Sequence, residues 1–155
     1  MHVHEPVIEY FNFLNSRFQN NLDIHVHNEA ISSSEREVVL SINGEETGIY
    51  QVGEEKLVVF AKDIFQVVDQ LGYVDLLEIN VEGAEYEILE RLISSSKIIE
   101  VNILQIQFHN FSDKHDLNRA RIRSSLAETH EKIFGYDWVW ERWVLKRSSE
   151  VLVDI

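Results

Sequence analysis

The chain has 155 residues, of which 45% are hydrophobic, and its 27 acidic against 14 basic residues give a net charge of -13. That length suits one hydrophobic core in a single domain spanning residues 1–155, and the acidic balance argues against nucleic-acid binding, which depends on neutralising phosphates with Lys and Arg. The sequence has no cysteine, no apolar run of membrane-spanning length and no signal peptide, so we expect a cytoplasmic protein with neither disulfides nor a membrane partner.

Short strands alternate with helices along the chain, which is typical of a mostly parallel α/β sheet. Apolar residues at three- and four-residue steps predict a first helix over 7–18, and the segment 22–27 predicts a strand. Residues 35–61 alternate or run in short apolar bursts broken by NGEETG and GEE, which predicts an exposed hairpin-like excursion. Asp63 can then cap a helix that ends at Gly72.

The run over 74–92, VDLLEINVEGAEYEILERL, predicts a strand that ends in a polar turn and opens into an amphipathic helix. A near-continuous apolar run predicts that this strand is covered on both faces: Leu76, Leu77 and Ile79. In open α/β sheets, ligands bind at such a junction. Polar side chains at the end of a buried strand indicate either helix capping or a binding site, and three follow here: Asn80, Glu82 and Glu85.

The rest of the chain predicts a strand over 103–108, a charged helix over about 112–132 and two closing strands. Alternating aromatic residues should lie on one side of the first closing strand: Tyr136, Trp138 and Trp140. We expect a turn near Glu141 and a return through Trp143 and Leu145. Core packing explains this aromatic stripe better than a sugar-stacking platform, because a strand that alternates in this way buries one face.

Several segments resemble the FkbM-type S-adenosylmethionine-dependent methyltransferases. The run LLEINVEGAEYEIL is similar to the family signature LLKIDVEGAEYEVL, and LQIQFHNF over 104–111 is similar to the fifth strand with its terminal histidine. YDWVWERWVLK over 136–146 resembles the closing antiparallel strands, while HVHEPVIEYFNFL and DIHVHNEAIS resemble the second and third strands. The resemblance covers nearly all of the chain and implies a Rossmann-like sheet, mostly parallel with antiparallel C-terminal strands.

The resemblance implies methyl transfer to a hydroxyl group of a sugar or a related small molecule or glycan. His109, Asn80 and Glu82 would share the rim where the fourth and fifth strands end. His109 suits a general base near neutral pH, although a lone histidine at a strand end could instead donate to a backbone carbonyl. Asn80 stands where many members have aspartate and can only position a substrate. We favour function over helix-start stabilisation for Glu82, and the two are balanced for Glu85.

The same resemblance places the cofactor, S-adenosylmethionine, at Glu5, Asn28 and Ala30. Glu5 would accept hydrogen bonds from the ribose, and Asn28 and Ala30 would approach the adenine. A complete domain would carry a first strand and a D-x-G-A-N-x-G loop ahead of Glu5, whereas the six glycines of this sequence form no G-x-G. Each hydrogen bond contributes roughly 0.5–1.5 kcal/mol, so we expect weak or no cofactor binding by this chain alone.

Two HVH segments offer a rival site made of four histidines: His2, His4, His25 and His27. Parallel pairing of the segments would put all four imidazoles on one face, where zinc or nickel could bind. Parallel spacing makes tetrahedral closure difficult, and a helix normally covers such a face. We therefore expect partly buried, hydrogen-bonded histidines and no metal.

A catalytically inactive, truncated remnant or a protein-interaction module is the alternative from a different functional class. A sheet without its first strand exposes edges that an isolated monomer must pair or cover. We therefore expect self-association into a homo-oligomer.

Overall fold

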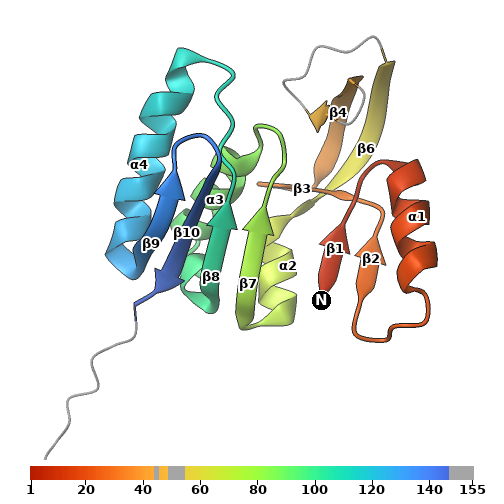
Figure 1. The fold of residues 1–155 in the computed structure, drawn as a ribbon, viewed down its shortest axis with the longest axis horizontal. Coiled ribbons are helices and arrows are strands. Elements are labelled where there is room, and N and C mark those ends of the chain that lie inside the picture. The colour runs from red at the N-terminus through yellow and green to blue at the C-terminus, as the bar shows by residue number, and fades with distance from the viewer. Residues whose placement is uncertain (44–45, 49–54, 147–155) are drawn as a thin grey trace, which may run out of the picture.

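The computed structural model describes residues 1–43, 46–48 and 55–146 (Figure 1). The helices are α1 (Ile8–Phe18), α2 (Ile64–Leu71), α3 (Glu85–Ser94) and α4 (Asp113–Thr129), with a short 3-10 helix at Lys97–Glu100. The strands are β1 (His2–His4), β2 (His25–His27), β3 (Ala30–Ser32), β4 (Arg36–Asn43), β5 (Glu46–Gly48), β6 (Glu55–Asp63), β7 (Val74–Ile79), β8 (Val101–Ile106), β9 (His130–Tyr136) and β10 (Trp140–Leu145).

Within the described residues, the strands form three sheets, with the orders β1-β2, β7-β8-β10-β9 and β3-β6-β4-β5. β1 runs parallel to β2 and β7 runs parallel to β8, whereas β10 is antiparallel to both β8 and β9. The α/β class and the antiparallel C-terminal strands agree with expectation, but the single, mostly parallel sheet was wrong. The sheets are split because, among the described strands, none pairs with both β1 and β7.

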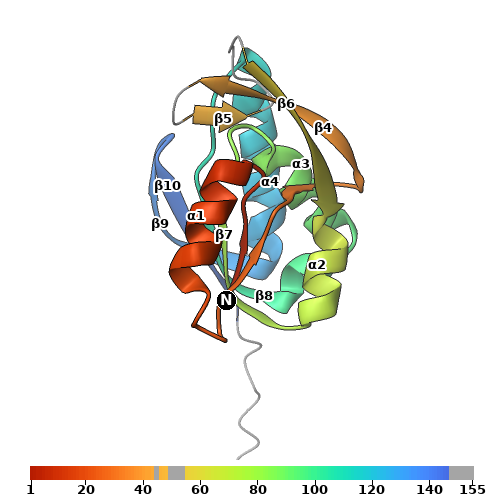
Figure 2. The same ribbon diagram turned by 90° about the vertical axis from the view of Figure 1, so that its right-hand side faces the viewer.

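The main hydrophobic core lies between the β7–β10 sheet and the helices on one of its faces. α3 and α4 lie together on that side of the sheet (Figures 1 and 2). The core includes Leu89 and Leu92 of α3, Leu104 and Ile106 of β8, and Leu126 of α4. On the other face, Leu76 is 50% exposed. The expectation that β7 is covered on both faces was therefore wrong, because the packed helices bury only one.

Local sequence signals explain where the first two helices begin and end. α1 begins at Ile8, one residue after the predicted start, and ends at Phe18 as predicted; in the described chain none of its residues is buried. The strand expected over 22–27 is shorter, because β2 begins only at His25. Asp63 caps α2 by accepting the backbone N–H of Phe65 at 2.9 Å. Gly72 ends that helix with φ 70°, a conformation that glycine adopts without strain.

The C-terminal hairpin differs from the sequence prediction. α4 ends at Thr129, and the turn between β9 and β10 lies at 137–139 instead of near Glu141. Trp138 occupies this turn with φ 58°, and its ring lies under the guanidinium of Arg119 at 4.3 Å. Because this turn falls between Tyr136 and Trp140, the aromatic side chains do not alternate along a single strand. Trp143 is consequently buried, whereas Tyr136 is exposed.

The excursion predicted over 35–61 contains the antiparallel pair β4 and β6, with β3 parallel to β6. Residues 44–45 and 49–54 of that prediction lie outside the described part of the chain. Val39 and Val58 face each other across the pair and are both exposed. No helix formed by the described residues is both long and apolar enough to cross a bilayer.

Candidate functional site

The candidate site lies where β7 and β8 end at the same edge of their sheet. Ile79 pairs with Ile106 at the carboxyl ends of these parallel strands. The backbone N–H of Gln107 then donates to the carbonyl of Ile79 at 2.9 Å, so the two loops leave the sheet side by side. This register brings His109 next to the turn that precedes α3.

The imidazole of His109 lies between two carboxylates. Its Nδ1 is 2.6 Å from Oε1 of Glu85, and its Nε2 is 3.3 Å from Oε1 of Glu82. The ring of Phe111 stacks on the imidazole, with the planes 8° apart and the centroids 5.8 Å apart. The structure thus brings together two of the three predicted catalytic residues, and adds a third group, Glu85, on the opposite ring nitrogen.

Glu85 is fully buried and contacts both the turn that precedes α3 and the imidazole of His109. Its carboxylate accepts the backbone N–H of Gly83 at 2.9 Å and that of Val81 at 3.3 Å, in addition to its contact with His109. A buried carboxylate needs such partners to offset its desolvation. The contact at 2.6 Å orients the imidazole so that Nδ1 of His109 faces Glu85 and Nε2 faces Glu82.

Backbone conformation explains how Glu82 reaches the histidine. Glu82 has φ 49° and Gly83 has φ 110°, so the turn passes through the left-handed region. This conformation costs a non-glycine residue roughly 1–2 kcal/mol, and the hydrogen bonds from this turn to Glu85 stabilise it. Asn80, the third predicted catalytic residue, directly follows β7 and is exposed at the same rim. The catalytic roles of these residues remain predictions.

Tyr86 and His115 support the loop that carries His109, and the sequence analysis did not identify either residue. The Tyr86 hydroxyl donates to the His109 carbonyl at 2.8 Å, and burial raises the pKa of Tyr86, so the phenol keeps its proton. His115 stacks on Tyr86 and accepts the backbone N–H of Phe111 at 2.9 Å. The only sequence signal was that Tyr86 directly follows Glu85 in the EGAEY run.

The predicted cofactor residues lie at the ends of β1 and β2. Oε1 of Glu5 accepts the backbone N–H of Val7 at 2.8 Å, and burial raises the pKa of Glu5. The side-chain amide of Asn28 donates to the carbonyls of Glu5 and Pro6 at 3.0 and 3.1 Å. Ala30 begins β3 opposite Ala61. Glu5 and Asn28 therefore lie next to each other. A carboxylate and an amide are groups that can form hydrogen bonds with a nucleoside. With no G-x-G in the sequence, the residues fit only that half of S-adenosylmethionine.

The four histidines lie on one face of the β1–β2 pair, as the sequence predicted. His2 pairs with His25 and His4 with His27, and neighbouring rings stack with centroids 4.7–5.3 Å apart. Nδ1 of His2 is 3.0 Å from Nε2 of His27, and His4 contacts Glu29. Burial, followed by the neighbouring histidines, lowers the pKa of His2 and of His4. A search of the described residues gives no group of three or more side chains able to hold a metal ion.

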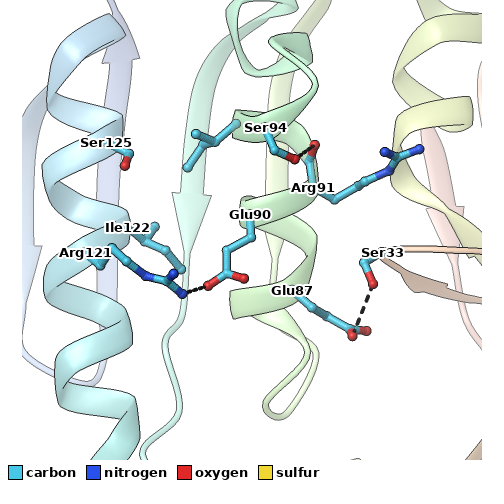
Figure 3. Close-up of a pocket in the computed structure, with 9 residues that line it drawn as sticks. Ser33, Glu87, Glu90, Arg91, Ser94, Arg121, Ile122 and Ser125 are labelled. Carbon is cyan, nitrogen blue, oxygen red and sulfur yellow. Dashed lines mark hydrogen bonds and ion pairs between the residues drawn. The ribbon is translucent and has the colours of Figure 1, made fainter.

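Two grooves lie between α3 and α4. The larger, of about 470 Å³, is crossed by the ion pair between Glu90 and Arg121 (Figure 3). Its described lining contains none of the predicted site residues: Ser33, Glu87, Glu90, Arg91, Ile93, Ser94, Arg121, Ile122 and Ser125. The smaller groove, of about 240 Å³, includes Gly83, Tyr86, His115 and Asn118 in its lining. It is the one next to the residues that support His109.

Comparisons with known proteins agree with this architecture. A family model described as the methyltransferase FkbM domain matches residues 3–136. The crystal structure of methyltransferase FkbM from Methylobacillus flagellatus KT is similar, with a TM-score of 0.55 and 14% sequence identity over 92% of this chain and 36% of that chain. The chain thus spans about a third of the length of that protein. No curated protein matches the chain. From the family match, the chain belongs to the methyltransferase FkbM domain family.

Proposed function

We propose that this domain transfers a methyl group from S-adenosylmethionine to a hydroxyl group of a sugar or a related small molecule. Family membership supports methyl transfer. A hydroxyl acceptor must lose its proton, and this requires a base at the site. The observation that carries the proposal is the contact of 2.6 Å between Glu85 and Nδ1 of His109, which directs Nε2 of the imidazole away from the buried carboxylate.

When bound, S-adenosylmethionine supplies a methyl group that is activated by its sulfonium. Nε2 of His109 would take the proton from the acceptor hydroxyl, which would make the acceptor oxygen a stronger nucleophile. Glu85 stabilises the resulting imidazolium through Nδ1, and Glu82 accepts the new N–H at Nε2. General-base catalysis of this kind contributes roughly 10²–10⁴-fold to the rate.

The smaller groove supports a polar acceptor. Five residues with hydrogen-bonding side chains line this groove: Glu87, Glu90, His115, Asn118 and Arg121. A compound rich in hydroxyl groups can exchange hydrogen bonds with carboxylates, an amide and a guanidinium.

The nucleoside of the cofactor would bind at the ends of β1 and β2. Glu5 would accept hydrogen bonds from the ribose hydroxyls, and Asn28 and Ala30 would lie against the adenine. The few hydrogen bonds available on this side favour weak binding, with a dissociation constant on the order of 1 mM, equivalent to about 4 kcal/mol.

Titration with S-adenosylhomocysteine, followed by amide chemical shifts of the full chain, tests the proposal. We expect millimolar ligand to shift amides near Glu5, Asn28 and Ala30, and Glu5→Gln to weaken the effect. Glu9→Gln, an exposed change on α1, is the matched control and should leave binding unchanged. A folded chain whose amides do not shift at saturating ligand would contradict the proposal.

A protein-interaction module or a catalytically silent remnant is the second candidate function. The edges of β1 and β7, which no described strand pairs, favour it, because such edges accept strands from other polypeptides. This candidate predicts no response to S-adenosylhomocysteine and self-association that light scattering would detect.

A further inference from the structure

The loop between β8 and α4 carries His109, and side chains from two helices hold this loop. Residues 107–112 are all described and none of them belongs to a helix or a strand, so the position of the loop depends on contacts from other elements. Glu85 and Tyr86 are the first two residues of α3, and His115 lies in the first turn of α4. Both helices therefore begin beside the loop.

α3 holds His109 at two points. The carboxylate of Glu85 contacts Nδ1 of the imidazole at 2.6 Å, and the hydroxyl of Tyr86 donates to the backbone carbonyl of His109 at 2.8 Å. Glu85 and Tyr86 are both buried. Two adjacent residues of one helix thus fix the backbone and one ring nitrogen of His109.

The ring of Phe111 restricts the imidazole further. It stacks on the ring of His109, with the planes 8° apart and the centroids 5.8 Å apart. Phe111 is itself 38% exposed. Because apolar stabilisation grows with the area removed from water, burial alone holds this ring weakly, and its position depends on how its backbone is held.

His115 holds the backbone of Phe111. Its Nδ1 accepts the backbone N–H of Phe111 at 2.9 Å. A backbone N–H can only donate, so Nδ1 is the acceptor, and a neutral His115 carries its proton on Nε2. His115 is buried and its ring stacks on Tyr86, with the planes 12° apart and the centroids 4.6 Å apart. The contacts therefore form a closed circuit from Tyr86 to His109, Phe111, His115 and back to Tyr86.

We propose that His115 is a positioning residue for the base, which it acts on through Phe111, and that Tyr86 belongs to the same unit. The proposal rests on the proposed role of His109 as general base. A base must lie within hydrogen-bond reach of the proton that it takes, and a misplacement of about 1 Å can cost on the order of 10²-fold in rate. Removing the acceptor at His115 frees Phe111 and, with it, the imidazole.

Two substitutions at His115 separate the hydrogen bond from the size of the side chain. In His115→Asn, the amide oxygen takes the place of Nδ1 and can still accept the N–H of Phe111. In His115→Leu, a side chain of similar size remains but the acceptor is lost. Leu117→Ala is the matched control on the same helix, because Leu117 is 75% exposed.

The NMR signals of the His109 ring protons in the full chain test the placement without any need for turnover. A stacked aromatic ring shifts the signals of protons close to it. We expect these signals to move in His115→Leu, with amide exchange at Phe111 roughly tenfold faster, and to stay at their native positions in His115→Asn and Leu117→Ala. Native signals in His115→Leu, or equal movement in His115→Asn, would overturn the proposal.

Steady-state kinetics with S-adenosylmethionine and a methyl glycoside adds a functional readout. His115→Leu should lower kcat on the order of tenfold to a hundredfold without changing the KM for S-adenosylmethionine, and His115→Asn should restore most of the loss. A native kcat in folded His115→Leu, together with a lower urea midpoint, would show a role in stability alone and overturn the proposal. Absence of turnover in the native chain would contradict the proposed function, whereas the ring signals would still decide the placement.

Tyr86→Phe tests the other side of the unit and decides the outcome where His115→Leu does not fold. It removes only the hydroxyl that bonds the His109 carbonyl, so the ring signals of His109 should move here as well. The double variant with His115→Leu should speed amide exchange at Phe111 by less than the product of the two single effects, because both substitutions open the same unit. Native ring signals in Tyr86→Phe, or independent effects in the double variant, would contradict the proposal.

Discussion

The two ends of the chain differ sharply in how well they are packed. α3 and α4 bury a continuous set of side chains against β8, including Leu89, Leu104 and Leu126. In the described residues of the unit β1–α1–β2, only Val7 is buried. The residues proposed to act on the acceptor therefore lie on the half with its own core, whereas those proposed to bind the cofactor lie on the half without one.

The two parts of the candidate site therefore depend on different sources of stability. His109 and Glu85 are fixed by local hydrogen bonds and by the core beneath them. Glu5 and Asn28 are fixed mainly by backbone contacts between two short strand ends. Regions with few buried apolar contacts open more readily, so the cofactor half should be the less stable part of the molecule.

The largest expected effect on stability comes from a buried ion cluster in the well-packed half. Glu141 is buried and accepts hydrogen bonds from Arg119, Arg123 and the indole of Trp143. Burial alone would raise the pKa of Glu141, but the two arginines hold it below its usual value. Glu141→Ala leaves Arg119 buried without its main partner and should lower the free energy of unfolding by about 3–5 kcal/mol in urea titrations.

Asp137→Ala is the matched control for that cluster. Asp137 contacts the same two arginines, but its side chain is 78% exposed. Its removal should change the free energy of unfolding far less than Glu141→Ala, because solvent screens an exposed ion pair. Equal losses in the two variants would mean that Glu141 is not the centre of the cluster.

A pair of truncations compares the two halves directly. Leu92→Ala removes a fully buried side chain of α3 and should destabilise the protein by about 2–5 kcal/mol. Phe13→Ala removes a larger but exposed side chain of α1 and should change stability by no more than about 0.5 kcal/mol. Thermal and urea unfolding measure both. A loss at Phe13 as large as that at Leu92 would show that α1 has a packed partner.

A smaller effect is expected at the start of α2. Asp63 caps the helix and is also bonded by the guanidinium of Arg91, with its shortest contact at 2.8 Å. Burial acts to raise its pKa, but these hydrogen bonds outweigh that effect and keep the pKa of Asp63 low. Asp63→Ala should cost about 1–2 kcal/mol. Asp69→Ala removes a more exposed carboxylate from the same helix and should cost less than about 0.5 kcal/mol.

The smallest effect is a loss of stability in mild acid. His130 is buried, and its Nε2 donates to the carbonyl of Val101 at 3.0 Å. Burial lowers the pKa of His130 from its ordinary value of 6.5, so the unfolded chain takes up the proton first. This contribution is complete above pH 6.5 and is lost as the pH falls through the lower pKa of the folded state.

We therefore expect the urea midpoint of the native chain to fall between pH 6.5 and pH 5 and to change little between pH 7 and pH 8. His130→Gln should fold less stably and show a weaker dependence on pH in the acid range. An unchanged pH dependence in this variant would contradict the assignment to His130.

Local patterns in the sequence predicted the elements that depend on local interactions. The helical spacing over 7–18, the Asp63 cap and the strand–turn–helix run over 74–92 all appear in the structure. The family resemblance also placed His109 and Glu82 at one rim, where the structure brings their side chains within 3.3 Å. These features depend on residues close in sequence or on paired parallel strand ends.

Features that depend on distant contacts could not be predicted in this way. Glu85 lies on a helical position where capping and function give the same pattern, and only the approach of His109 distinguishes them. The turn at Trp138 depends on its contact with Arg119 of α4, which alternation cannot show. The split of the sheet arises because no described strand pairs with both β1 and β7, and the local sequence pattern does not show which strands pair.

The measurement that tests the central claim most directly is turnover of S-adenosylmethionine by the full chain. Release of S-adenosylhomocysteine is followed at millimolar cofactor with a panel of methyl glycosides, for the native chain, His109→Asn and Glu78→Gln. Glu78 is exposed on β7 and contacts Gln105, so its variant is the control. We predict turnover by the native chain and the control, and a loss of about 10²–10⁴-fold in His109→Asn with unchanged S-adenosylhomocysteine binding. Equal turnover in His109→Asn, or none by the folded native chain, would contradict the account.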